Sequence, residues 1–216
     1  MTDRDLVTYY RLRAQEYDRL YERPDRQGDI RGLAALLRPV VSGRRVLELA
    51  AGTGYWTPIM AAVAESVVAT DINPETLAIA QARDYARANV EFRIADAYRP
   101  EEIAGDFDCV VAGYFLSHVP RDRVVPFLES AVDRVGRGGR VVLIDNLYVD
   151  DSSLPITRTD ADGNTYQTRR LDSGETFEVL KNFYDGTELE QLARVHASHV
   201  EVHLLTYYWF MQMDLG

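Results

Sequence analysis

The segment from Val46 to Thr57, which reads VLELAAGTGYWT, constrains the fold of this chain more than any other. It begins as a short apolar run that contains one acid, Glu48, and the turn Ala51-Gly52-Thr53-Gly54 follows at once. Glycine permits a sharp backbone turn and lets a ligand approach without meeting a side chain. A helix placed directly after the turn offers unpaired N–H groups at its N-terminus. The segment therefore predicts a strand, a glycine-rich turn and a helix that together hold a small ligand against bare backbone.

The same turn argues against two phosphate-binding motifs. A P-loop needs Gly-Lys-Ser/Thr at the start of the helix, and no such tripeptide occurs here. A dinucleotide fingerprint needs a glycine or alanine where this chain has Thr57, because helix and strand pack closely at that point. Glu48 would also repel a pyrophosphate group. An acid in this strand instead suits a ligand that carries positive charge.

The segment resembles motif I of the class I S-adenosylmethionine (SAM)-dependent methyltransferases, E/D-x-G-x-G-x-G. Glu48, Ala50, Gly52 and Gly54 stand at its four defining positions, with Ala50 in place of the first glycine. The sulfonium and the α-amino group of SAM are both cationic, which agrees with an acid at Glu48. The resemblance covers essentially the whole chain and implies SAM as the cofactor and S-adenosylhomocysteine (SAH) as the product.

Composition narrows the class of protein and its partners. The 216 residues suffice for one domain with a sizeable core, and the net charge of −10, from 24 basic and 34 acidic residues, disfavours a nucleic-acid substrate. The single cysteine, Cys109, fits a reducing compartment. With a polar N-terminus and no apolar run of transmembrane length, we expect a cytoplasmic protein with no membrane partner, either a monomer or a homodimer. No His/Cys spacing of the zinc kind is present, so no metal is expected.

Short apolar strands alternate with helices along the middle of the chain, which predicts an α/β fold with a parallel sheet. The strands are expected at 46–49, 67–70, 90–94, 107–112 and 140–144, and the helices at 56–65, 74–88 and 121–135. A helix at 187–197 and two closing strands, 200–205 and 207–213, follow. The resemblance implies a Rossmann-like doubly wound seven-stranded sheet of order 3-2-1-4-5-7-6 with strand 7 antiparallel.

Two further regions complete a predicted single domain of residues 1–216. Helices at 6–22 and 27–38, the second ended by Pro39, form an N-terminal helical cap over residues 1–40. Residues 147–182 are an insertion in which strands 165–171 and 176–180 form a β-hairpin around Gly174. We expect this hairpin to cover the active site.

Acids at strand ends mark the predicted cofactor site, since ligands of such folds bind at the carboxyl ends of the strands. By resemblance, Asp71 accepts from both ribose hydroxyls (motif II), and Asp96 accepts from the adenine amino group (motif III). Each acid also has a local alternative, as a helix cap or a turn former. The predicted cofactor-binding residues are Tyr17, Glu48, Ala50, Gly52, Gly54, Trp56, Asp71, Ile72, Asp96, Ala97 and Ala112.

The predicted acceptor side combines the N-terminal helix with the ends of the fourth and fifth strands. Tyr10, Arg13 and Tyr17 share a helix face, and aromatic faces attract a sulfonium. Tyr114 and His118 follow the fourth strand and are the catalytic candidates, with His118 either a general base or a local structural residue. The predicted substrate-binding residues are Tyr10, Asn146 and Tyr184.

Missing motifs narrow the acceptor to a small molecule. Metal-dependent catechol-type methyltransferases have an Asp-Asn pair like Asp145-Asn146 at the end of the fifth strand. They also need an acid at the end of the fourth strand, where this chain has Ala112-Gly113, so a metal site is not expected. The Asn/Asp-Pro-Pro-Tyr/Phe loop of nucleic-acid amino methyltransferases is absent too. The resemblance thus implies methyl transfer by in-line displacement in a biosynthetic pathway, with O-methylation favoured over N- or C-methylation. A nicotinamide-dependent oxidoreductase and a non-catalytic SAM-binding protein stay open as alternatives.

Overall fold

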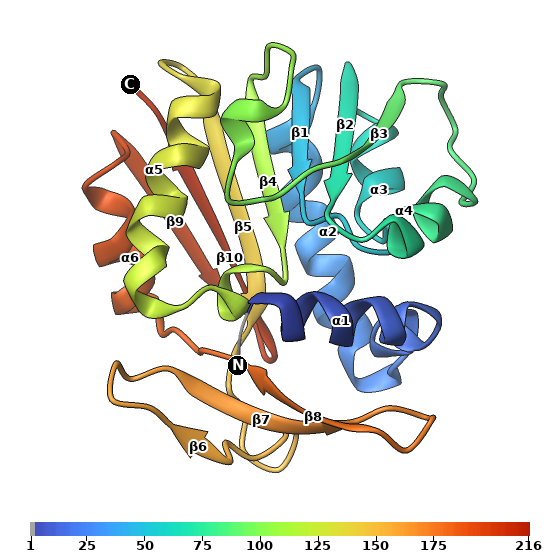
Figure 1. Ribbon diagram of the computed structural model, residues 1–216. Coiled ribbons are helices and arrows are strands. Elements are labelled where there is room, and N and C mark those ends of the chain that lie inside the picture. Colours follow the sequence, from blue (N-terminus) through green and yellow to red (C-terminus); the bar gives the residue numbers. More distant parts are fainter. Residues whose placement is uncertain (1–2) are drawn as a thin grey trace.

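In a computed structural model of the protein, residues 3–216 are described, with all side chains except those of residues 3–5 and 20. A seven-stranded sheet of order β3-β2-β1-β4-β5-β10-β9 forms its centre (Figure 1). Its strands are β1 (Arg45–Leu49), β2 (Ser66–Asp71), β3 (Val90–Ile94), β4 (Cys109–Gly113), β5 (Arg140–Asn146), β9 (His199–Leu204) and β10 (Tyr208–Asp214). The predicted strand order is therefore confirmed.

The first five strands run parallel, and β10 pairs antiparallel with both β5 and β9. Strand β10 is thus the antiparallel seventh strand of the prediction. Apolar side chains of β1 alternate between two core clusters, with Val46 in one and Leu47 and Leu49 in the other. Burial on both faces explains why residues 46–49 of this strand read as an apolar run with a single polar exception, Glu48.

Helices cover both faces of the sheet (Figure 1). On one face, α2 (Gln27–Val41) and α3 (Thr57–Ala61) contribute to the core cluster that contains Val46. On the other face, α5 (Val124–Val135) and α6 (Gly186–Arg194) contribute to the cluster that contains Leu47. Helix α4 (Pro74–Gln81) contacts β2 and β3.

Several helix boundaries differ from the sequence-based expectation. Helix α2 continues through Pro39 to Val41, although an internal proline removes one hydrogen bond. The burial of Leu37, Val40 and Val41 offsets that loss. The N-terminal helix changes from α1 (Asp3–Arg13) to the 3₁₀ segment η1 (Ala14–Leu20), and α3 and α4 end earlier than predicted. Side-chain spacing indicates the periodicity of a helix but does not fix where tertiary packing ends it.

Other 3₁₀ segments occupy the connections, namely η2 (Pro24–Arg26), η3 (Pro100–Glu102), η4 (Leu116–His118) and η5 (Arg121–Arg123). Segment η4 follows β4 directly, so it places Leu116, Ser117 and His118 at the carboxyl edge of the sheet. All three side chains are buried there.

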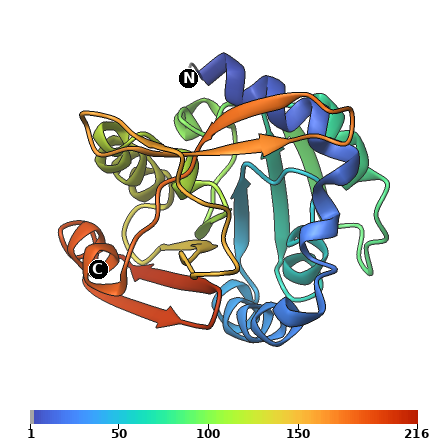
Figure 2. The same cartoon turned by 90° about the horizontal axis from the view of Figure 1, so that it is seen from below.

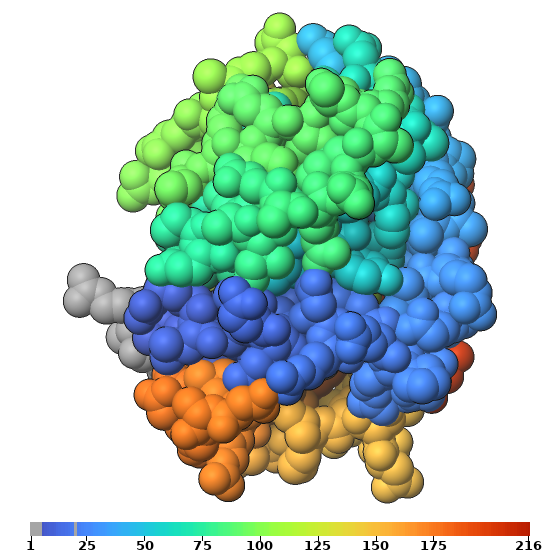
Figure 3. Space-filling model, turned by 90° about the vertical axis from the view of Figure 1, so that its right-hand side faces the viewer, coloured from blue at the N-terminus to red at the C-terminus, as the bar shows by residue number. Residues whose placement is uncertain are grey.

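A second, antiparallel sheet contains β6 (Arg158–Thr159), β7 (Thr165–Arg170) and β8 (Thr176–Leu180). The hairpin of β7 and β8 agrees with the predicted strands, whereas the two-residue β6 was not predicted. Helix α1 lies between this sheet and the carboxyl ends of the parallel strands (Figures 1 and 2). Seen from the side, the N-terminal residues form a band with the tip of the small sheet below it (Figure 3).

Tyr9 fastens α1 to the small sheet. It is buried in a core cluster with Leu171 and Val179, and its ring lies 5.5 Å from that of Phe177. This packing fixes the position of α1 over the carboxyl edge of the large sheet. Among the residues that the structure describes, none of the helices is long and apolar enough to span a lipid bilayer.

The two glycines of the turn after β1 serve different purposes. Both have positive φ angles, +58° at Gly52 and +74° at Gly54. A Cβ atom at Gly54 would lie 2.6 Å from Cβ of Ala80 in α4, whereas a Cβ atom at Gly52 would meet nothing within 4 Å. Gly54 is therefore required for helix packing, and Gly52 leaves open space for a ligand.

We expect Gly54→Ala to destabilise the protein more than Gly43→Ala does. Gly43 has a similar φ of +67° and open space around it, so the control carries the backbone strain but not the clash with Ala80. The clash itself should cost about 1–3 kcal/mol. Urea denaturation followed by circular dichroism measures both free energies of unfolding. Equal losses of unfolding free energy in the two variants would show that α4 shifts to accommodate the new Cβ atom at no energetic cost.

Candidate active site

Two cavities meet beneath α1 at the carboxyl edge of the sheet. The turn cavity lies against the turn after β1 and is lined by Leu6, Val7, Tyr10, Tyr17, Ala50, Gly52, Thr53, Asp71, Ile72, Asn73, Thr76, Ala95, Asp96, Ala97, Tyr98, Gly113, Tyr114, Phe115 and His118. The arginine cavity, of about 590 Å³, lies on the side of the small sheet. Tyr10, Tyr17, Tyr114 and His118 line both cavities, so these side chains mark the junction.

The carboxylate of Asp71 holds the turn in place. Its Oδ2 accepts from the backbone N–H of Gly52 at 2.9 Å, and its Oδ1 accepts from that of Asn73 at 2.8 Å. Burial raises the pKa of Asp71, and these backbone bonds partly oppose the rise. Each oxygen has a further lone pair, so the carboxylate can accept additional hydroxyl groups from a ligand in the turn cavity.

The rest of the turn cavity is mostly apolar. Ile72 lines it and keeps 44% of its surface exposed, which suits a flat apolar group. Asp96 uses its Oδ1 to accept from the backbone N–H of Tyr98 at 2.9 Å. Ala50 and Tyr114 have the unusual φ angles of +52° and +58°. Such strained residues gather at functional sites, and here each is the first residue after its strand, Ala50 after β1 and Tyr114 after β4.

Several residues predicted for the site lie behind the cavities instead of lining them. Trp56 packs against Gly113, and Ala112 is buried within β4. Tyr184 belongs to the core on the α5 and α6 face, and the guanidinium carbon of Arg121 lies 5.3 Å from the centre of its ring. The roles predicted for Trp56, Ala112 and Tyr184 therefore remain predictions without a direct contact to either cavity.

Glu48 also lies one layer behind the turn cavity. It is buried, and its Oε2 accepts from the Thr57 hydroxyl at 2.6 Å. Burial raises the pKa of Glu48 from 4.5 to about 8, although the Thr57 bond works in the opposite direction. Thr57, which argued against a dinucleotide site in the sequence, is thus the partner of the buried acid.

His118 is held by both of its ring nitrogens. Its Nδ1 lies 2.6 Å from the carbonyl oxygen of Leu180, so Nδ1 carries the proton and donates it. Nε2 must then accept from the Tyr10 hydroxyl, which is 2.6 Å away. Burial and the charges of Lys181 and Arg169 keep the pKa of His118 well below its usual range. The imidazole is consequently neutral, with its lone pair occupied by Tyr10.

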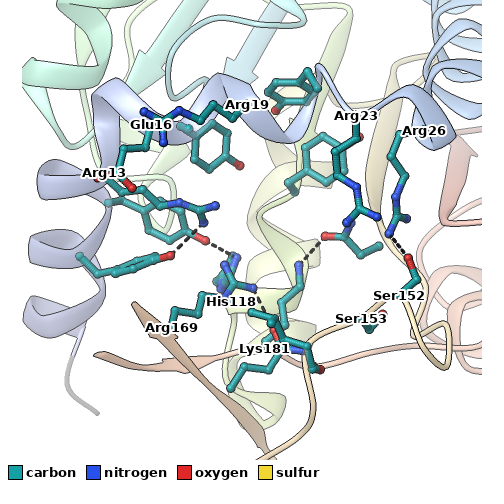
Figure 4. Close-up of a pocket in the computed structure, with 18 of the residues that line it drawn as sticks. Arg13, Glu16, Arg19, Arg23, Arg26, His118, Ser152, Ser153, Arg169 and Lys181 are labelled. Atoms are coloured by element: carbon teal, nitrogen blue, oxygen red, sulfur yellow. Dashed lines mark hydrogen bonds between the residues drawn. The ribbon is translucent and has the colours of Figure 1, made fainter. Parts of the chain in front are cut away.

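Basic side chains surround the arginine cavity (Figure 4). They are Arg13, Arg19, Arg23, Arg26, Arg169, Arg170 and Lys181, and Glu16 is the acid beside them. Some are compensated, since Arg19 pairs with Asp172 at 2.6 Å, and Arg23 and Arg26 share Asp25. The cavity nevertheless carries an excess of positive charge inside an acidic protein.

Arg13 and Arg169 have no carboxylate within 4 Å among the described residues. Arg13 donates to the Tyr9 hydroxyl at 2.9 Å and lies 5.5 Å from the centre of the Tyr17 ring. Arg169 donates to Gln167 at 3.0 Å, and its Nε is buried with no hydrogen-bond partner among the described residues. Two guanidinium groups at the cavity are therefore free to bind an anion.

A buried ion pair connects the small sheet to the end of β5. Lys181 and Asp145, 4% and 0% exposed, lie 3.0 Å apart. The Asp145 carboxylate also accepts from the N–H and the hydroxyl of Ser117 and from the N–H of Asn146. Burial lowers the pKa of Lys181 to about 8, and Asp145 opposes the shift. Asp145 is thus occupied by protein donors.

Comparison with known proteins decides the family. A methyltransferase-domain family model matches residues 46–139. The solved DhpI–SAH complex is 30% identical, with a TM-score of 0.79 over 100% of this chain and 99% of that chain. The DhpI–SAM–HEP complex is 28% identical, with a TM-score of 0.77 over 98% of this chain and 99% of that chain. The chain belongs to the class I SAM-dependent methyltransferase family.

A curated relative agrees with this assignment. The demethylmenaquinone methyltransferase of Lactococcus lactis subsp. lactis (strain IL1403) is 32% identical over 136 residues, which are 61% of this chain and 48% of the relative. The methyltransferase described here thus spans about half the length of that curated relative. Membership of the family confirms SAM as the cofactor, and it argues against the nicotinamide-dependent oxidoreductase that the sequence left open.

The structure brings together most of the predicted site residues and adds others that the sequence did not indicate. Tyr17, Ala50, Gly52, Asp71, Ile72, Asp96 and Ala97 line the turn cavity. Tyr10 and Asn146 line the arginine cavity. Nothing in the sequence singled out Arg169, which stands there as half of the basic pair Arg169-Arg170. The ion pair between Lys181 and Asp145 was not predicted either.

We expect the stability of the methyltransferase to depend on pH through Glu48. Between pH 4.5 and about 8 the folded protein holds a proton on Glu48 that the unfolded chain has released, so stability falls as pH rises through this window. Glu48→Gln keeps an oxygen for Thr57 but cannot ionise. Its stability, relative to the wild type, should therefore rise by a few kcal/mol between pH 5 and pH 8.

Urea denaturation at pH 5, 6, 7 and 8 measures this difference. Glu65→Gln, at an exposed glutamate, is the matched control and should follow the wild type. If the unfolding free energies of the wild type and Glu48→Gln changed in parallel with pH, the pKa of Glu48 would not be raised in the folded protein.

Proposed function

We propose that the turn cavity holds SAM and that the protein transfers the methyl group to an oxygen of a small acidic molecule in the arginine cavity. The observation that carries the proposal is Arg169, a guanidinium at the cavity that has a buried Nε without a partner. An uncompensated buried charge is costly, so a site of this kind is arranged for a ligand of opposite charge. An ionised carboxylate or phosphonate fits the planar donor fork of arginine.

The overall charge of the protein supports a specific anion site in this cavity. With a net charge of −10, the protein as a whole repels anions, yet basic side chains converge on one cavity. General attraction to polyanions does not explain such a concentration. Selective binding of a small anion does, because field lines are focused where like charges line a cleft.

For the cofactor, we propose the roles that the sequence predicted. Asp71 accepts from the ribose hydroxyls, Asp96 accepts from the adenine amino group, and Gly52 leaves space for the methionine end. Tyr17 contributes an aromatic face at the junction of the cavities, where a sulfonium would be attracted. The geometry that supports these roles is the common lining of one cavity by Asp71, Asp96, Gly52 and Tyr17.

For catalysis, we propose that the protein brings the acceptor oxygen close to the methyl group and uses their opposite charges, without a histidine base. An acidic acceptor is already ionised near neutral pH, so no proton has to be removed. His118 has no free lone pair, because Tyr10 donates to it. His118 then positions Tyr10 at the junction, while Tyr114 borders both cavities. A low-dielectric, water-excluding junction favours the reaction of a cationic sulfonium with an anionic oxygen, since the opposite charges cancel in the transition state.

We expect Asp71→Asn to weaken SAH binding roughly 10- to 100-fold, because hydrogen bonds to a charged group are lost. Isothermal titration calorimetry measures the affinity. Asp108→Asn is the matched control, since Asp108 pairs with Arg45 and lines neither cavity. A folded Asp71→Asn variant with wild-type affinity would contradict the ribose assignment.

We expect the wild type, saturated with SAH, to bind phenylphosphonate but not the neutral benzyl alcohol. The Arg169→Gln variant should lose roughly 10- to 100-fold in affinity for phenylphosphonate, because a charged donor is removed. The control Arg158→Gln removes the same charge from β6, outside both cavities. The binding is measured by calorimetry, and SAH release from SAM then tests phenylphosphonate and benzoate as acceptors. Equal affinity for the anionic and the neutral probe would contradict an acidic acceptor.

A pH–rate profile separates this mechanism from base catalysis. With a carboxylate acceptor such as benzoate, which stays ionised across this range, the rate should be flat between pH 6 and 8. A fall in activity as the pH drops through this window would instead indicate that a group of the enzyme acts as a general base. The predicted biosynthetic role, cytoplasmic location and monomeric or homodimeric state all stay predictions.

A further inference from the structure

Lys181 lines the arginine cavity (Figure 4), yet its ammonium group is fully used by the protein. Its Nζ donates to Ser117 Oγ at 2.7 Å, to Asp145 Oδ1 at 3.0 Å and to Asn146 Oδ1 at 2.7 Å. An ammonium has three donors and no acceptor. Lys181 therefore has no N–H left for a ligand, although its charge and its place suggest an anion clamp.

The bond to Lys181 determines the orientation of the Asn146 amide. Only Oδ1 can face an ammonium group, because the amide NH₂ is itself a donor. The Nδ2 atom must then point away from Lys181. Asn146 lines the arginine cavity, and no described residue accepts from its Nδ2. At a position that lines the arginine cavity, the side chain thus carries an N–H₂ group that has no partner among the described residues.

The surrounding network keeps this arrangement rigid. The backbone N–H of Asn146 donates to Asp145 Oδ1 at 2.8 Å, which fixes the end of β5. On the other side of the ion pair, the backbone N–H of Asn182 donates to the Ser117 carbonyl at 2.7 Å. Lys181 is therefore held between β5 and η4 and cannot withdraw from Asn146 without breaking a buried pair, which is costly.

We infer that Asn146 is a specificity-determining donor to the oxyanion of the acceptor, and that Lys181 is a positioning residue that acts through it. The inference rests on the proposed function, because it names the contact that the acidic acceptor makes at this side of the cavity. The charge of Lys181 on Oδ1 polarises the amide and strengthens its N–H as a donor. A rigid donor of this kind accepts a carboxylate or phosphonate oxygen and rejects an ammonium or amine N–H at the same place.

The test measures the affinity of phenylphosphonate for SAH-saturated protein by calorimetry. Asn146→Ala removes the donor and should weaken binding about 10-fold or more. Asn146→Asp keeps the shape and the acceptor for Lys181, but it replaces the donor with a carboxylate and should weaken binding further. Gln191→Glu, at an exposed residue of α6, adds the same charge elsewhere and should leave the affinity unchanged. SAH affinity should be unchanged in all three, since Asn146 does not line the turn cavity.

The role of Lys181 is tested by a double-mutant cycle with Lys181→Met and Asn146→Ala. If Lys181 acts through Asn146, the two losses in phenylphosphonate affinity are strongly non-additive. Should Lys181→Met fail to fold, the Asn146 variants still decide between the two residues. If Lys181 bound the anion directly, Asn146→Ala would release one of its protons and preserve or tighten binding.

Two outcomes overturn the inference in distinguishable ways. Wild-type affinity in Asn146→Ala, with the anion still bound by the wild type, refutes the role of Asn146 alone and leaves the proposed acceptor class intact. A wild type that does not bind phenylphosphonate refutes the acidic acceptor, and the inference falls with it.

Discussion

The parallel alignment of five strands, most of them buried, is the constraint on which the rest of this structure depends. Parallel strands need crossover helices, and those helices cover both faces of the sheet. The strand ends are then the place where polar groups meet ligands without disturbing the core. The turn after β1, Asp71 after β2, Asp96 after β3, and Tyr114 and His118 after β4 all lie at that edge, so residues far apart in the sequence line a common cavity.

A second, separate arrangement completes the acceptor side. Helix α1 and the small sheet close over the carboxyl edge, and they are held by polar contacts as well as by apolar ones. Tyr10 of α1 bonds to His118, His118 bonds to Leu180 of β8, and Lys181 bonds to Asp145 and Asn146 at the end of β5. These contacts couple α1, η4, β8 and β5. The arginine cavity is thus formed by parts that the sheet alone does not position.

The two cavities also differ in the charges of the side chains that line them. Two acids, Asp71 and Asp96, line the turn cavity, and Asp71 is engaged with backbone N–H groups. Glu48 lies behind this cavity and stays protonated at neutral pH, because burial raises its pKa to about 8. The arginine cavity is bordered by cations. A cationic methyl donor and an anionic acceptor would meet at the tyrosines and His118 that line both cavities. The opposite polarity of two adjoining cavities in one protein supports a reaction between oppositely charged partners.

Much of this could be predicted from the sequence, because the relevant signals are local. The apolar runs, the glycine-rich turn and the strand-end acids each lie within a few consecutive residues. They predicted a parallel sheet with a ligand at the carboxyl ends of its strands, and the resemblance that they carry implied the strand order. Helix ends were less predictable, as Pro39 inside α2 shows, since burial of Leu37 and Val40 outweighs the cost of the proline.

Only the tertiary structure decided the composition of the arginine cavity. Lys181, Asp145 and Ser117 are dozens of residues apart in the chain, and no periodicity connects them. Whether a cation is free to bind a ligand depends on what its N–H groups already contact, which distinguishes Arg169 from Lys181. The sequence by itself therefore determined the fold and the methyl donor, because the motifs that carry both are short local stretches of the chain. The polarity of the arginine cavity was decided by long-range pairing of charges, which only the folded chain brings together.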